Sequence, residues 1–100
     1  MTLIAFVRHQ IQPGKVPAAA DRIRSNGDRM AEQPGFVSRE LLRAADGSDE
    51  LATITVWASR DDYDAWQEHN RSANVHAGSE TPYVGSPSTA LFVRYEDEGS

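Results

Sequence analysis

The pattern of hydrophobic and polar residues predicts a strand followed by a helix in the first third of the chain. Thr2–Ile11 is rich in β-branched and aromatic residues and ends before Pro13 and Gly14, which is typical of a strand. Pro17 suits the first turn of a helix, and this helix should end before Pro34. Its inward stripe, at spacings of three and four, consists of Val16, Ala20, Ile23, Gly27 and Met30.

Gly27 is an unfavourable residue inside this helix, because glycine there costs about 1 kcal/mol relative to alanine. Either the helix bends at Gly27, or another part of the chain packs closely against it. The sequence leaves both explanations open.

The middle of the chain predicts a hairpin followed by a second helix. The strands Gly35–Ala45 and Leu51–Ser59 are separated by an Asp-Gly turn, which favours a β-hairpin. Ser59 and Asp62 nearly match a capping box, with Asp in place of Glu, and predict a helix that begins at Arg60. The inward stripe of this helix consists of Tyr63, Trp66, Asn70 and Ala73.

A last strand, Thr89–Glu96, completes the order β-α-β-β-α-β. This order is the ferredoxin-like, split βαβ arrangement of the α+β class, with an antiparallel sheet and two helices on one face. The strands show no clean polar alternation: Ile4 and Phe6 point to one face and Val7 to the other, so both faces should be buried. A chain of 100 residues cannot cover the second face itself, and we expect a homodimer through the open sheet face.

Composition narrows the classes of protein. With 39% hydrophobic and 25% charged residues, we expect one globular domain over residues 1–96 and an acidic tail over residues 97–100. The lack of cysteine removes disulfides, thiolate chemistry and thiolate metal sites. A net charge of −5, with scattered basic residues, argues against a nucleic-acid partner. Without a signal peptide or a membrane-length apolar segment, we expect a cytoplasmic protein with no membrane partner.

The chemistry must then come from histidine, carboxylates, tryptophan, tyrosine or a bound molecule. An apolar pocket with a few polar groups is typical of small-molecule sites, and the space between the second helix and the sheet could form one. Histidine is the natural base there, because its usual pKa lies near neutrality. The residues that could line this pocket are Trp57, Trp66, Tyr63, Phe36, Phe92, His9, His76 and Arg8.

Structural roles compete with functional ones at several of these positions. Trp57 ends a strand beside a helix cap, where a large aromatic residue commonly seals a core. Trp66 lies at helical spacing, which is typical of core residues as well as of a pocket wall. His76 shares a broad face with Trp66 only if the helix continues past Arg71, whereas His69 should face solvent.

Three stretches together resemble the antibiotic biosynthesis monooxygenase superfamily. They are "PGFVSRELLR", "ELATITVWASRDDYDAW" and "NVHAG", and the resemblance spans most of the chain, from about Phe6 to about Tyr95. It implies a small dimeric α+β barrel.

Two branches of the superfamily imply different chemistry. In the haem-degrading branch, Trp66 and His76 would match the helix tryptophan and the haem-iron ligand. In the cofactor-independent branch, which oxidises anthrone-like aromatic polyketides, Trp57 would match. Both branches use an asparagine on the first strand, and that position falls at Val7, which cannot donate a hydrogen bond from its side chain.

The leading hypothesis is a dimeric monooxygenase that oxygenates a flat, electron-rich aromatic with O₂, without a metal, a flavin or another cofactor. A haem-binding or haem-degrading protein, with haem as its cofactor, is the first alternative, and a non-catalytic ligand-binding or structural dimer is the second. The expected catalytic residues are His76, Trp66 and Trp57. The expected substrate-binding residues are Val7, Arg8, His9, Phe36, Tyr63, Asn70 and Phe92.

Overall fold

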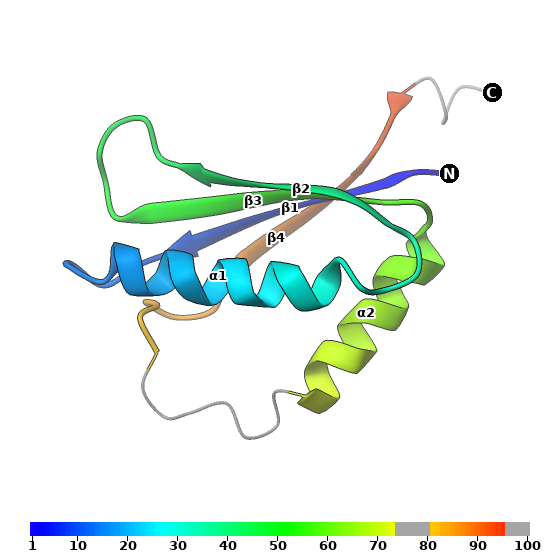
Figure 1. Cartoon of the computed structure of the whole chain (residues 1–100). Helices are drawn as coiled ribbons and strands as arrows, with labels where there is room; N and C mark the ends of the chain where they lie inside the picture. The colour runs from blue at the N-terminus through cyan, green and yellow to red at the C-terminus, as the bar shows by residue number, and fades with distance from the viewer. Residues whose placement is uncertain (74–80, 96–100) are drawn as a thin grey trace.

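The computed structural model describes residues 1–73 and 81–95 and confirms the ferredoxin-like α+β fold (Figure 1). The observed elements are β1 (Leu3–Gln10), α1 (Val16–Met30), β2 (Phe36–Arg43), β3 (Glu50–Trp57), α2 (Arg60–Ala73) and β4 (Ser88–Val93). α1 ends at Met30, consistent with the prediction that this helix ends before Pro34. β4 ends at Val93 instead of the predicted Glu96. No helix in the described ranges is long and apolar enough to cross a membrane.

The sheet has the order β2-β3-β1-β4, and every neighbouring pair is antiparallel. At the start of the central strand β1, Leu3 is paired with Trp57 on β3 and with Val93 on β4. The β2–β3 hairpin turns through Gly47, whose φ of +81° favours glycine, as the Asp-Gly turn predicted. The first βαβ unit is therefore split, with β3 lying between β1 and β2.

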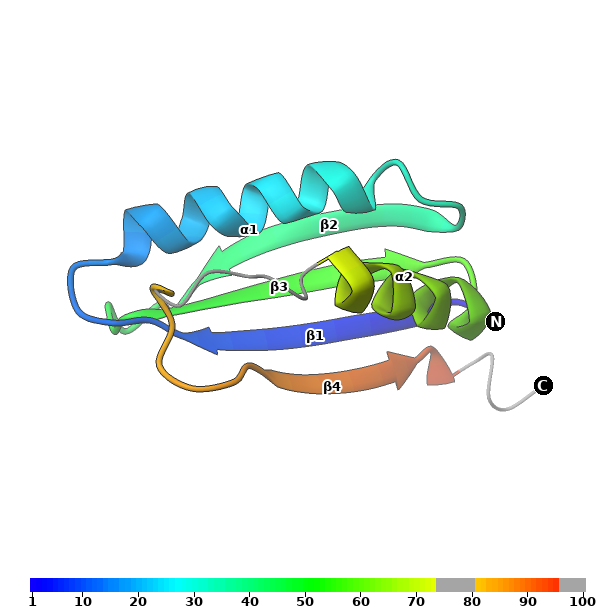
Figure 2. The ribbon, with the colours of Figure 1, turned by 90° about the horizontal axis from the view of Figure 1, so that it is seen from below.

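Both helices cover the same face of the sheet (Figures 1 and 2). Side chains alternate along β3, so that every second residue points toward the helices and is buried there. Those residues are Leu51, Thr53, Thr55 and Trp57. One part of the core gathers around Trp57 and Trp66, and a second part gathers around Ile23 and Leu51.

No helix or strand within the described residues covers the other face of the sheet. Ile4 and Phe6 are only partly buried there, and Phe92, which is paired with Ile4, is 54% exposed. One copy of the chain therefore buries one face of its sheet.

The start of α2 is fixed by the predicted cap. The Asp62 backbone N–H donates to Ser59 Oγ at 3.1 Å, and the Ser59 hydroxyl donates to Asp62 Oδ2 at 2.9 Å. Gly35 lies directly against this cap with a φ of +84°, and a Cβ at Gly35 would clash with the Asp62 side chain. The loop before β2 and the first turn of α2 are thus packed together.

Candidate functional site

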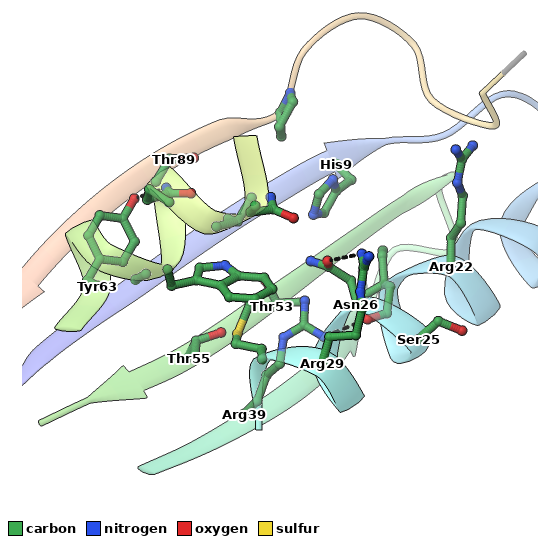
Figure 3. Close-up of a pocket in the computed structure, with 18 of the residues that line it drawn as sticks. His9, Arg22, Ser25, Asn26, Arg29, Arg39, Thr53, Thr55, Tyr63 and Thr89 are labelled. Carbon is green, nitrogen blue, oxygen red and sulfur yellow. Dashed lines mark hydrogen bonds between the residues drawn. The ribbon is translucent and has the colours of Figure 1, made fainter. Parts of the chain in front are cut away.

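A cavity of about 510 Å³ lies between the sheet and the two helices (Figure 3). Its walls come from β1, α1, β2, β3, α2 and the segment that leads into β4. Thr53 and Thr55 of β3 line it from the sheet, because their side chains point toward the helices. All layers of the fold therefore contribute to one candidate site.

Tyr63 and Trp66 of α2 form an aromatic wall of the cavity. The Trp66 ring is stacked on Trp57, with 6.4 Å between ring centroids and 26° between ring planes. Phe36 packs edge-on against Trp57, with 5.9 Å between ring centroids and 89° between ring planes. Trp66 is thereby held between the cavity and a rigid aromatic layer.

His9 is the described histidine that lines the cavity. Its ring centroid lies 5.3 Å from that of Tyr83, another lining residue. Burial lowers the pKa of His9, and the positive charge of Arg39 lowers this pKa further. The lowered pKa favours the neutral imidazole, which can accept a proton.

Arg39 reaches from β2 into the layer between the sheet and α1. Its Nη1 donates a hydrogen bond to the Ile23 carbonyl oxygen at 2.6 Å. A Cβ at Gly27 would clash with this same Nη1, so the guanidinium occupies space that a side chain at residue 27 would take. Close packing against Gly27 is the explanation that the structure supports.

The charge of Arg39 is not neutralised by the described part of the chain. No ion pair there includes Arg39, and its buried Nε has no hydrogen-bond partner. Burial lowers the pKa of Arg39, which is the sign of a cation that has lost water without gaining an anion. Arg22 and Arg29 of α1 also line the cavity, whereas no Asp or Glu does so within the described ranges.

The structure brings together five of the predicted site residues at this cavity. They are Val7, His9, Tyr63, Trp66 and Asn70. His76 lies outside the described residues. Val7 contributes no hydrogen-bond donor, but the amides of Asn26, Gln67 and Asn70 line the same space.

Four of the expected site residues do not line this cavity. Side chains alternate between the two faces along a strand, and Arg8 and Phe92 fall on the uncovered face. On that face, Arg8 Nε donates a hydrogen bond to the Glu50 carboxylate at 2.5 Å. Trp57 is 1% exposed and lies behind Trp66, while Phe36 packs on Trp57. Trp57 and Phe36 thus support the wall without forming its surface.

The sequence analysis missed the cationic residues of the cavity and Tyr83. Strand alternation places Arg39 on the same face of β2 as Leu41, but alternation alone does not say that this face carries a cavity. Gly27 was the available signal, since a helical glycine marked a close approach. Among the described residues, no group of three or more His, Asp or Glu side chains could hold a metal ion.

Comparison with known proteins identifies the family and supports the fold. The family model described as "Antibiotic biosynthesis monooxygenase" matches residues 2–78. A search of curated proteins found no match. Similar solved structures include two that are 20% identical to this chain, and at that level of identity they show the fold alone.

SnoaB, a cofactor-independent oxygenase from Streptomyces nogalater, aligns with a TM-score of 0.74 and 20% identity, over 93% of this chain and 92% of its own. MhuD, a haem degrader from Mycobacterium tuberculosis solved with two haems in its active site, aligns with a TM-score of 0.78 and 20% identity, over 93% of this chain and 95% of its own. Proteins with this fold therefore include both a cofactor-independent and a haem-binding member.

Proposed function

This chain belongs to the antibiotic biosynthesis monooxygenase family, and from that premise we propose that its cavity oxygenates a flat, electron-rich aromatic molecule with O₂. The observation that carries the proposal is the position of the His9 imidazole in a cavity whose wall includes Trp66 and Tyr63. The aromatic wall suits stacking of a flat ring, and the imidazole suits removal of its acidic proton.

The proposed reaction requires no metal or flavin. His9 accepts a proton from an acidic C–H group of the substrate, and the resulting carbanion transfers one electron to O₂. The substrate radical and superoxide combine and take back the proton as a hydroperoxide, which then loses water and leaves a carbonyl group. The positive charge of Arg39 favours the carbanion, because it acts across a site that is partly shielded from water.

Oxygen consumption with an anthrone as substrate tests this proposal. We expect His9→Gln to lower the rate by roughly 10²-fold or more, because a positioned base contributes about that factor. His69→Gln is the matched control, since His69 contacts Trp66 but does not line the cavity. An unchanged rate in His9→Gln would remove His9 as the base, while a role for His76 stays a prediction.

A haem-binding function is the second candidate, favoured by cationic residues beside a neutral imidazole. The imidazole of His9 has the chemistry of an iron ligand, and Arg22 and Arg29 at the exposed edge could hold propionates. When bound, the haem iron would supply oxygen activation. Titration with hemin should then shift the Soret band, and comparison of His9→Ala with His76→Ala would identify the ligand; the absence of a shift would exclude this candidate.

We also propose that two copies associate through the uncovered sheet face. Exposed apolar side chains on one face of a sheet are costly in water, and a symmetric partner removes that cost. The apolar residues on this face are Ile4, Phe6, Leu42, Ala52, Ile54, Val56, Ala90 and Phe92. The association would leave the cavity on the outer, helix-covered side of each sheet.

A further inference from the structure

The described lining of the cavity contains arginines and no carboxylate, in a protein whose net charge is −5. Three of the ten basic residues line it, and in Figure 3 their side chains lie along the α1 and β2 side of the cavity, away from Tyr63. Arg22 and Arg29 are exposed at its edge, while Arg39 is half-buried between α1 and β2. The cavity thus has an aromatic end and a cationic end.

Arg39 makes the cationic end unusual. An arginine remains protonated in a protein, so its burial costs free energy unless an anion or several hydrogen bonds compensate it. The Ile23 carbonyl satisfies one N–H, but Nε is enclosed without a partner. Gly27 leaves room for this guanidinium, since an added Cβ would lie against Nη1, and no Asp or Glu of residues 1–73 and 81–95 lines the cavity beside it.

Resting on the proposed function of this cavity, we propose that the substrate is an aromatic carboxylate, whose ring lies against Trp66 and whose carboxylate is bound by Arg39. The planar guanidinium suits a planar carboxylate, because it can donate two parallel hydrogen bonds. Arg22 and Arg29 would add attraction at the entrance. Arg29 is already oriented by a hydrogen bond from Nη2 to Asn26 Oδ1 at 2.8 Å.

The substrate carboxylate is charged before the reaction begins, whereas the carbanion forms only during the reaction. Arg39 would bind the carboxylate before any proton is removed, so its effect appears in substrate affinity and not only in rate. Arg39 would therefore determine which aromatic compounds enter the site.

Isothermal titration calorimetry with 2-naphthoate and its uncharged analogue 2-naphthamide tests the inference. We expect the native chain to bind the acid about tenfold more tightly than the amide or better, since hydrogen bonds to charged groups are the stronger ones. Arg39→Gln should abolish the preference, and Arg29→Gln should reduce it without altering any buried contact. Arg43→Gln is the matched control, because Arg43 lies on the same strand, is exposed and does not line the cavity.

Each other outcome contradicts the inference in a distinct way. Equal binding of the acid and the amide would overturn the proposal that the site recognises a carboxylate, while leaving the proposed function of the cavity intact. Binding of neither compound would overturn both. A preference that survives in Arg39→Gln and Arg29→Gln would exclude these arginines as the cause. A fourth outcome is that protoporphyrin IX binds more tightly than its dimethyl ester while 2-naphthoate does not bind. The arginines would then recognise the carboxylates of a tetrapyrrole, and the proposal of a smaller aromatic acid as substrate would be overturned.

Discussion

Gly27 and Arg39 depend on each other in this structure. Glycine lowers the stability of α1, yet any larger residue at position 27 would meet the Arg39 guanidinium. The guanidinium in turn provides positive charge that lowers the pKa of His9. A backbone position on one helix thereby affects the protonation of a side chain on the neighbouring strand.

A double-mutant cycle measures this dependence. In an Arg39→Ala background, Gly27→Ala should raise the free energy of unfolding by about 1 kcal/mol, which is the helix-propensity difference. In the native background the gain should be smaller or reversed, because the new Cβ displaces Arg39 from Ile23. Urea unfolding followed by circular dichroism gives both values, and equal effects in the two backgrounds would contradict the packing described here.

His9 makes stability depend on pH in a direction that its lowered pKa fixes. The unfolded chain binds a proton at His9 near pH 6.5, whereas the folded chain binds it only at lower pH. Stability from this group is therefore fully present above about pH 6.5 and is lost as the pH falls toward the folded pKa. The difference in unfolding free energy between the native chain and His9→Gln should shrink over that window.

An NMR titration of the His9 ring checks the cause of this shift. Its midpoint should lie below the usual histidine value of about 6.5. Arg39→Gln should move the midpoint upward without restoring the usual value, because burial is the larger cause. A midpoint that does not move would contradict the charge interaction between Arg39 and His9.

At the scale of elements, Gly35 joins the loop before β2 to the cap of α2. Gly35→Ala should lose roughly 2–3 kcal/mol, combining the cost of a left-handed alanine with the loss of the Ser59–Asp62 cap. Gly47→Ala is the control, because Gly47 has a φ of +81° and nothing within 4 Å of an added Cβ. Equal losses in the two variants would show that the contact with Asp62 contributes nothing.

The elements were predictable because their signals are local. The Asp-Gly turn and the Ser59 cap each determine a boundary within a few residues of chain, and both are confirmed.

The face of each strand was not predictable from alternation, since β1 and β3 are apolar on both sides. Phe92 and Arg8 were consequently assigned to the cavity although they lie on the uncovered face. Arg39 was not predicted to line the cavity because its surroundings include α1. This helix is separated from β2 by a loop, so the contact between them is not a local signal.

At the scale of the whole molecule, the uncovered face should control oligomeric state. The chain of 11.0 kDa should sediment at about twice that mass, and Phe92→Lys should shift it toward the monomer by placing a charge in the interface. Val84→Lys is a matched control: Val84 is 55% exposed and Phe92 54%, but Val84 lies outside the sheet. Sedimentation of the native chain as a monomer would contradict the proposed association.

The stack of Trp66 on Trp57 has an optical consequence. These are the two tryptophans of the chain, so the intrinsic fluorescence excited near 295 nm comes from one pair of rings. One member of that pair forms a surface of the cavity, while the other is buried behind it. The protein thus carries its own fluorophore at the candidate site, and a molecule that enters the cavity should change the emission of the whole chain without any label.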